Sequence, residues 1–237
     1  MKNIFKTAIV CLCTFGMLAS CEKAEEGLVK VTHYAVFDVK GVDANGLTVS
    51  PAGSTFTDPG VVCKEGTEDV TSKVKIVSDV NANKPGVYSI NYSVNNVDGF
   101  ASNASRTVLI YNPDATVRDL SGVYTVADNS YRINTAGAKT PFSGFDIEIV
   151  KVAPGSYYIS DYMGGYYDQR AGYGSAYAME GYFSLNNDNT IDYHTADVAG
   201  WGDSADNVVA SYDEATGAIN LEVKYAGSLT FYVTLTK

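Results

Sequence analysis

The octapeptide LTFYVTLT at residues 229–236 is the clearest indication of the fold class of this chain. It alternates apolar positions with threonine or tyrosine, so that Leu229, Phe231, Val233 and Leu235 fall on one side. Successive side chains of a β-strand point to opposite faces, and only a strand places these four on the same face. A shift of the pairing register by one residue would expose the whole apolar set to solvent. The stretch therefore predicts a β-strand with a strongly specified register.

The same alternation recurs along the chain. Residues 88–94 place Tyr88, Ile90, Tyr92 and Val94 on one face, and residues 145–149 do the same with Phe145, Ile147 and Ile149. No segment shows the i, i+3, i+4, i+7 spacing of an amphipathic helix over three turns. Turn dipeptides separate the apolar runs, at 45–46, 59–60, 85–86, 98–99, 154–155 and 216–217. Many short strands with regular turns predict an all-β protein made of sandwiches or barrels.

Composition and charge exclude several function classes. The 237 residues are 46% hydrophobic, which excludes an intrinsically disordered chain. Asp and Glu outnumber Lys and Arg by 27 to 17, so we expect no nucleic-acid partner. Two histidines leave little material for histidine-based catalysis or a zinc site. No stretch of 18 apolar residues follows the first 20 positions, which excludes a protein with several membrane-spanning helices.

Residues 1–20 have the organisation of a signal peptide. Lys2 and Lys6 precede an apolar run at 7–18, and the segment ends in Leu18-Ala19-Ser20-Cys21. This ending resembles the lipobox of bacterial lipoproteins. The resemblance implies cleavage after Ser20 and acylation of Cys21, which would anchor the chain in a membrane. The alternative is an ordinary secretory signal in which Cys21 is incidental.

The tether that follows, residues 21–27, is short and acidic. It resembles the export signals that place lipoproteins of Bacteroides-type bacteria in the outer membrane, facing the cell exterior. The alternative is a merely solvated linker.

Once residues 1–20 are removed and Cys21 is acylated, Cys63 has no cysteine partner. The exported chain must therefore be held together by core burial. We expect Cys63 to be a small buried hydrophobe.

A polar, proline-containing stretch at 112–117 separates two predicted domains, 28–112 and 117–237. The first contains Phe56-Thr57-Asp58-Pro59-Gly60-Val61, the turn Pro85-Gly86 before an alternating strand, and a hairpin turn at Asp98-Gly99. This order of elements resembles the bacterial surface immunoglobulin-like domains of exported proteins, many Bacteroides lipoproteins among them. The resemblance implies an N-terminal Ig-like β-sandwich.

The second predicted domain opens with Leu120-Ser121-Gly122-Val123-Tyr124 and continues as a Tyr- and Gly-rich chain of about eight strands. It resembles the C-terminal β-barrel-like domain that follows such an Ig-like module in Bacteroides lipoproteins. We therefore expect an antiparallel β-barrel or sandwich, lipocalin-like in form. No motif in this domain assigns a chemistry.

The candidate binding site lies in a Tyr- and Gly-rich stretch at 157–177 and around the single tryptophan. Tyrosine and tryptophan offer flat apolar faces with a polar edge, which suits sugars or protein surfaces. Asp161 is a further candidate for hydrogen bonds to hydroxyl groups. The candidate ligand-binding residues are Tyr162, Tyr166, Tyr167, Asp168, Arg170, Tyr173 and Trp201. Alternatively, the loop packs its own rings over a barrel mouth, and Trp201 plugs one barrel end.

Other constellations are weaker. Residues 186–192 carry oxygen ligands at calcium-like spacing but lack the loop Gly and terminal Glu of an EF-hand, so a hairpin explains them more simply. His33 and His194 have no neighbouring nucleophile motif. We therefore predict no catalytic residue, no metal site and no cofactor.

Taken together, the sequence predicts a surface-anchored, non-catalytic lipoprotein. It resembles the glycan-binding accessory lipoproteins of Bacteroides polysaccharide-utilisation systems. That resemblance implies a polysaccharide ligand and an outer-membrane transporter complex as partners. The alternative is a structural or protein-interaction lipoprotein, in which the Tyr-rich loop or an edge strand binds another protein. A third hypothesis is that the protein is a hydrolase.

Overall fold

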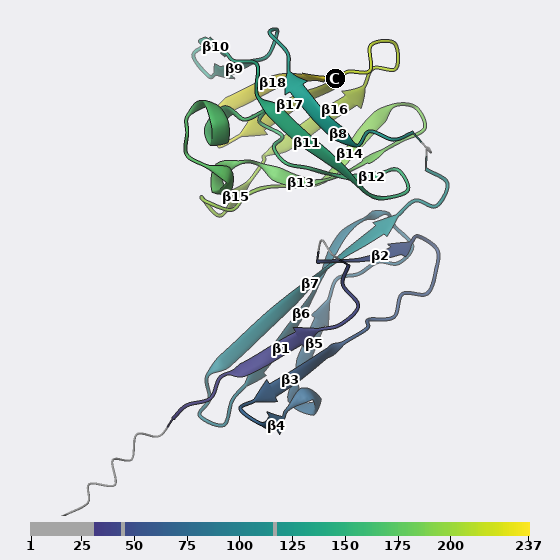
Figure 1. Cartoon of the computed structure of the whole chain (residues 1–237), viewed down its shortest axis with the longest axis vertical. Coiled ribbons are helices and arrows are strands. Elements are labelled where there is room, and N and C mark those ends of the chain that lie inside the picture. The colour runs from purple at the N-terminus through teal and green to yellow at the C-terminus, as the bar shows by residue number, and fades with distance from the viewer. Residues whose placement is uncertain (1–30, 44–45, 116–117) are drawn as a thin grey trace, which may run out of the picture. The chain divides into compact units, whose positions relative to one another are not determined.

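The computed structural model describes residues 31–43, 46–115 and 118–237 (Figure 1). The predicted signal peptide, the tether and Cys21 lie outside the described residues. The described strands form three sheets, two built from residues 35–111 and one from residues 122–236. The all-β fold class predicted from the sequence is confirmed. Within the described ranges, no helix is long and apolar enough to cross a membrane.

The N-terminal region is a sandwich of two sheets, here called the Ig-like region. One sheet has the order β1-β3-β4 and the other β2-β7-β6-β5. Strand β2 runs parallel to β7, and the remaining pairs are antiparallel. The bounds are β1 Ala35–Val39, β2 Leu47–Pro51, β3 Val61–Glu65, β4 Glu68–Asp69, the short 3-10 helix η1 Thr71–Lys73, β5 Lys75–Ser78, β6 Gly86–Asn95 and β7 Ala101–Tyr111.

The longest hairpin of the Ig-like region, β6–β7, turns where the sequence predicts. Gly99 has a φ of 88°, a conformation that costs a residue with a side chain extra strain. The side chain of Asn96 accepts hydrogen bonds from the backbone N–H groups of Asp98 and Phe100 at 3.1 and 2.8 Å. These bonds satisfy turn donors that no strand partner reaches, and the predicted Asp98-Gly99 hairpin is confirmed.

Two small apolar clusters form the core of the Ig-like region. Ile90, Tyr92, Val108 and Ile110 of β6 and β7 pack against side chains of β1 and β3 in the other sheet. Cys63 is fully buried in the second cluster, with Ala35, Val70 and Val94, as the sequence analysis expects. Because each cluster holds only a few side chains, apolar burial is divided between two places.

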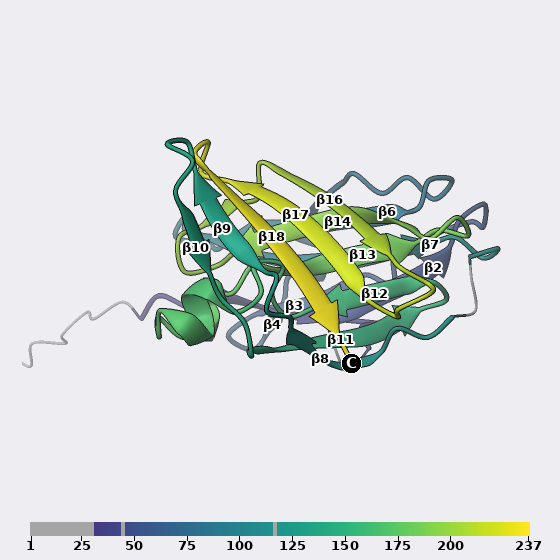
Figure 2. The ribbon, with the colours of Figure 1, turned by 90° about the horizontal axis from the view of Figure 1, so that it is seen from above.

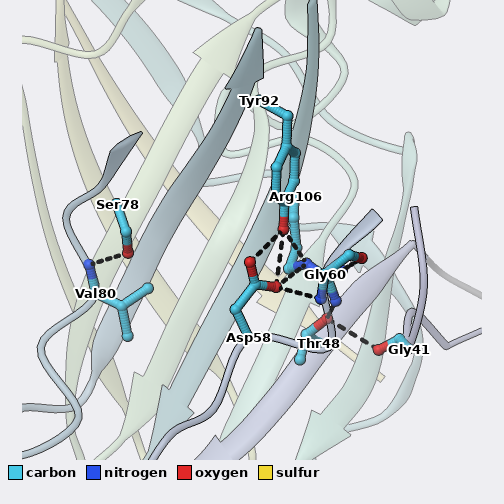
Figure 3. A network of polar contacts seen from close by, with 8 residues as sticks. All are labelled: Gly41, Thr48, Asp58, Gly60, Ser78, Val80, Tyr92 and Arg106. Atoms are coloured by element: carbon cyan, nitrogen blue, oxygen red, sulfur yellow. Dashed lines mark hydrogen bonds and ion pairs between the residues drawn. The ribbon is translucent and has the colours of Figure 1, made fainter. Parts of the chain in front are cut away.

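A buried arginine links the two sheets (Figure 3). Arg106 of β7 is 1% exposed, and its guanidinium donates to Tyr92 Oη, Thr48 Oγ1 and the carbonyl of Gly60 at 2.8–2.9 Å. Asp58 forms an ion pair with Arg106 at 3.3 Å and accepts a hydrogen bond from Tyr92 at 2.8 Å. Gly60 immediately precedes β3, so one side chain connects the two sheets in a region without a disulfide.

The C-terminal region is a closed barrel of eight antiparallel strands, called the barrel below. The ring runs β8-β11-β12-β13-β14-β16-β17-β18, and β18 pairs with β8 to close it. Figure 2 shows β16, β17 and β18 side by side, with β9 next to β18 and β10 next to β9. The bounds are β8 Gly122–Val126, β9 Tyr131–Asn134, β10 Lys139–Pro141, β11 Asp146–Ala153, β12 Ser156–Ile159, β13 Glu180–Leu185, β14 Thr190–Val198, β15 Asp203–Ser204, β16 Asn207–Tyr212, β17 Ile219–Tyr225 and β18 Leu229–Thr236.

The barrel interior is filled by the inward-facing side chains of its strands. In β18, Phe231, Val233 and Leu235 are buried, and Leu229 is half-buried, in the register that the alternation predicts. Tyr157 and Phe183 stack in the same core with ring centroids 5.2 Å apart. Because the interior is a packed core, the surface features that remain to bind a ligand are the loops at the barrel ends and the outer wall.

Candidate functional site

The β12–β13 connection, residues 160–179, contains two short helical turns. They are a π-helix, η2 Tyr166–Arg170, and a 3-10 helix, η3 Ser175–Tyr177. Gly165, with a φ of 73°, immediately precedes η2. Gly164, Gly172 and Gly174 also have positive φ, a backbone conformation that residues with a side chain rarely adopt, so glycines let the connection turn tightly here.

Asp161 fixes the start of this connection. Its carboxylate is 1% exposed and accepts hydrogen bonds from the backbone N–H groups of Met163, Gly165 and Met179 at 2.7–3.0 Å. Burial raises the pKa of the Asp161 carboxyl to about 6, although the three backbone donors lower it. Asp161 is therefore an internal brace that joins both ends of the connection. The sequence analysis expected it to form hydrogen bonds with a ligand, and this expectation is wrong because the carboxylate is buried.

Tyr162 and Tyr166 are also core residues. Their exposed fractions are 0% and 5%, so neither ring faces solvent. Tyr166 packs edge-on against Phe142 and Phe231, and the guanidinium of Arg170 lies 4.8 Å from its ring centroid. The expectation that these two tyrosines contact a ligand is corrected. The large rings enter the barrel end because burying an aromatic ring is more favourable than leaving it in water.

The structure brings five other rings together in what we call the aromatic patch. It consists of Tyr167, Tyr173, Tyr177, Trp201 and Tyr225. Trp201 is 42% exposed, and its ring lies 4.8 Å from Tyr167 and 4.9 Å from Tyr177, centroid to centroid. Tyr173 is 57% exposed and lies 6.3 Å from Trp201. Tyr173 and Trp201, 28 positions apart in the sequence, thus share one surface, whereas Tyr225, which is 5% exposed, is a buried support for the Trp201 ring.

Two docked loops hold the aromatic patch. Trp201 sits in the turn between β14 and β15, and the backbone N–H of Gly200 donates to the carbonyl of Ala176 at 2.6 Å. A Cβ on Gly200 would lie 2.8 Å from both that carbonyl oxygen and the Tyr177 ring, so a side chain does not fit there. This close approach explains why glycine precedes the tryptophan.

Asp168 and Arg170 lie at the border of the aromatic patch. Asp168 is half-buried next to Tyr167, and its carbonyl accepts a hydrogen bond from Gly174 at 3.3 Å. Arg170 is exposed, and its guanidinium lies over the ring of the buried Tyr166. Both remain reachable from solvent. In the described part of the chain, however, the ring contacts of Trp201 are with tyrosines, and neither Asp168 nor Arg170 takes part in them.

The sequence analysis missed Tyr177 and Tyr225 as members of the aromatic patch. Tyr225 is the last residue of β17, and its sequence context indicates only a strand. Its hydroxyl donates a hydrogen bond to the Asp203 carboxylate at 2.9 Å. Burial, followed by the hydrogen bond to Asp203, raises the pKa of Tyr225. Tyr177 had only its place in the Tyr-rich stretch as a signal. Strand pairing places Tyr225, and the docking of two loops places Tyr177, and neither can be derived from the sequence.

A groove on the outer wall of the barrel is a second surface feature. Its volume is about 590 Å³, and its lining residues all belong to β11, β12, β13 and β14. Tyr158 and Tyr182 line it with their rings edge to face and their centroids 5.7 Å apart. Glu148, Glu180 and Asp197 supply its carboxylates.

The weaker constellations have structural explanations. Residues 186–192 form the β13–β14 hairpin, in which Asn186 donates to Thr190 and Asp192 at 3.0 Å, as the simpler interpretation predicts. His194 pairs with Ser184 at 2.8 Å, and burial lowers its pKa. Among the described residues, no group of three His, Cys, Asp or Glu side chains is arranged to hold a metal ion.

A disulfide-free Ig-like sandwich joined to a closed antiparallel barrel defines a class of two-domain β-protein. A family model described as bacterial surface protein, Ig-like domain, matches residues 33–110. The model of the BT2262-like C-terminal domain matches residues 112–237. The lipoprotein BT2262 from Bacteroides thetaiotaomicron is 40% identical, covering 86% of this chain and 100% of its own, with a TM-score of 0.49. The chain belongs to the BT2262-like family.

Two further solved structures come from Clostridium perfringens ZmpB. One contains CBM51-2 in complex with GlcNAc and INT domains (19% identity, 53% of this chain, 29% of that chain, TM-score 0.28). The other contains the M60 catalytic domain with CBM51-1 and CBM51-2 (21%, 53%, 14%, TM-score 0.27). Likeness at this level carries no argument about this chain. A search of curated proteins gave no match. Neither matched family description names a catalytic activity.

Proposed function

We propose that this protein is a non-catalytic, cell-surface lipoprotein that binds glycans through the aromatic patch. The observation that carries the proposal is the exposure of Trp201 and Tyr173, at 42% and 57%, on two loops that dock together. The apolar face of a pyranose ring stacks on exposed aromatic rings of this kind, and tyrosine hydroxyls at the edge exchange hydrogen bonds with sugar hydroxyls.

The supports of the aromatic patch make it suitable for recognition. Trp201 packs against Tyr167, Tyr177 and Tyr225, so its ring has little freedom to lose on binding. The Asp161 brace holds the connection that carries Tyr167, Tyr173 and Tyr177. A surface ordered before binding loses less conformational entropy when a ligand arrives, which raises affinity without any additional contact.

The anchor is part of the same proposal. Acylation of Cys21 would hold the chain in the outer membrane with its body facing the cell exterior, and the Ig-like region would act as a spacer. Two or three acyl chains are enough for stable anchoring, whereas one gives reversible attachment. An outer-membrane transporter complex is the partner that would receive a captured glycan. Mass spectrometry of the native protein should find a cleaved N-terminus at an acylated Cys21, and an unmodified thiol there would contradict the anchor.

Affinity electrophoresis against a panel of neutral and acidic polysaccharides tests glycan binding. We expect retardation of the wild type by at least one neutral polysaccharide, and loss of retardation in Trp201→Ala and Tyr173→Ala. The matched control is Phe100→Ala, which removes a ring that is 50% exposed in the Ig-like region and should leave mobility unchanged. The proposal fails when no polysaccharide retards the protein, or when the control variant behaves like Trp201→Ala.

One observation favours the second candidate function, protein interaction. Strand β5 lies at the edge of its sheet and exposes Ile76 and Val77, at 55% and 67%. An open edge with apolar side chains is a site where a strand of another protein can add. Pull-down from outer-membrane extract with wild type and Ile76→Lys distinguishes the two functions. A stoichiometric protein partner that Ile76→Lys releases, together with indifference to sugars, would support this candidate.

A further inference from the structure

The groove on the outer wall is shaped by a glycine and two tyrosines. Gly181 lies between Glu180 and Tyr182 on β13, and a Cβ there would lie 1.9 Å from the carbonyl oxygen of Thr195. Strand β14 therefore approaches β13 too closely for any side chain at this position. The register shift between Tyr182 and Phe183 accompanies this approach.

The groove carries uncompensated negative charge. Glu148, Glu180 and Asp197 line it, and in the described part of the chain none of the three takes part in an ion pair. Their hydrogen bonds come from hydroxyl groups. Tyr158 donates to Glu180 at 2.6 Å, and Ser204 donates to Asp197 at 2.6 Å. Hydroxyl groups are thus the kind of donor that these carboxylates already accept.

Short stretches of chain join the groove to the aromatic patch. Glu180 follows Tyr177 by three residues, and Asp197 precedes Trp201 by four, a Cα separation of at most ~14 Å. Glu180 and Asp197 face each other across the β13–β14 ladder. Asp197 also pairs with Ser204 at the base of the β14–β15 hairpin that carries Trp201.

We infer that the groove is a second subsite of the glycan-binding site and selects an uncharged chain of several sugar units. The inference rests on the proposed function. One unit would stack on Trp201, and the following units would lie along Tyr158 and Tyr182 with their hydroxyls donating to Glu180 and Glu148. Carboxylates repel uronate and sulfate groups, so the same residues exclude acidic glycans.

Isothermal titration with disaccharides and hexasaccharides tests the subsite. The probes are xylo-, cello-, manno- and malto-oligosaccharides, with hexagalacturonate as the acidic ligand. We expect a neutral hexasaccharide to bind at least about tenfold more tightly than its disaccharide, the gain that one charge-assisted hydrogen bond supplies. We expect no binding of hexagalacturonate to the wild type.

Variants separate this inference from the proposed function. Glu180→Gln and Glu148→Gln keep the side-chain size. Each should lower the affinity for the hexasaccharide without changing the affinity for the disaccharide. The double variant should bind hexagalacturonate. The matched control is Glu222→Gln, a carboxylate on β17 away from the groove. Trp201→Ala should abolish binding of both neutral lengths.

Two results overturn the subsite while leaving glycan binding intact. One is equal affinity for two and six units in a wild type that still depends on Trp201. The other is a hexagalacturonate affinity equal to that of the neutral hexasaccharide. An absence of binding by every glycan overturns the proposed function and the subsite together.

Discussion

The Ig-like region and the barrel are both β-structures that contain no disulfide in their described residues, but their interiors differ. In the described residues, the barrel buries one cluster of 26 side chains, whereas the Ig-like region has two clusters of four. The Ig-like region adds a buried polar network around Arg106 that links its two sheets. A closed ring stabilises itself by apolar burial, whereas a thin open sandwich needs a specific cross-sheet connection.

This difference also explains where the candidate site lies. Closure of the barrel pairs every ring strand on both sides, so its connections are free to extend without leaving a sheet edge open. The longest of them contributes Tyr166 to the core and Tyr173 to the surface. The Ig-like region instead ends its second sheet at the exposed strand β5. Binding through rings and binding through an edge strand therefore belong to different regions of the molecule.

The largest expected effect comes from Arg106→Ala. It removes the cross-sheet connection and the guanidinium that Asp58, Tyr92 and Thr48 contact, which should cost about 5 kcal/mol of unfolding free energy in the Ig-like region. Amide hydrogen exchange in β6 and β7 measures the loss. Trp201 is the single tryptophan and reports on the barrel, so its fluorescence midpoint in urea should stay unchanged.

The control for this variant is Lys75→Ala, an exposed cation on β5. It should change exchange rates in β6 and β7 little. Equal effects of both variants would show that the Ig-like region does not depend on the buried arginine. A drop of the Trp201 midpoint in Arg106→Ala would show that the loss of stability is not confined to the Ig-like region.

The next largest effect is expected from Phe231→Ala in the barrel. Phe231 is fully buried and contacts Tyr166 and Tyr167, so the cavity should cost about 4 kcal/mol of unfolding free energy. Here the Trp201 fluorescence midpoint should fall, while exchange in β6 and β7 stays unchanged. Val209→Ala, at a position 58% exposed on β16, serves as the control and should shift the midpoint little. A small shift for Phe231→Ala would mean that the barrel core collapses around the gap.

The smallest of the three effects is a pH dependence from Asp161. Its folded pKa of about 6 exceeds the ordinary value of 3.8, so the folded protein binds more protons between these values. The contribution of Asp161 to the unfolding free energy should therefore be complete below about pH 4 and decline as the pH rises through 6, by on the order of 3 kcal/mol in total.

A ¹³C NMR titration of the Asp161 carboxyl measures this pKa directly, and we expect a midpoint near 6. The slope of unfolding free energy against pH should flatten in Asp161→Asn between pH 4 and 6. A midpoint below the ordinary value of 3.8 would contradict the expectation, because it would mean that the backbone donors of Met163, Gly165 and Met179 outweigh burial.

Several elements could be predicted from particular residues. The alternation at 229–236 determined both the strand and its inward face, and Asp98-Gly99 determined a hairpin turn, because these signals are local. The Tyr-rich stretch was less predictable. Tyr162, Tyr166 and Tyr173 have similar glycine-rich neighbours, yet the first two are buried and the third is exposed. Which ring enters the barrel end depends on the space left by Phe142 and Phe231, and sequence spacing does not contain that information.

The strand pattern, the two kinds of β-region and the aromatic residues available for binding all follow from the order of amino acids, since periodicity and turn chemistry act between neighbours along the chain. Folding in three dimensions is what brings Trp201 to Tyr173 and Tyr177, joins two sheets through Arg106, and places Glu180 and Asp197 on one groove. These contacts join residues that are distant in sequence, and strand order and register fix them.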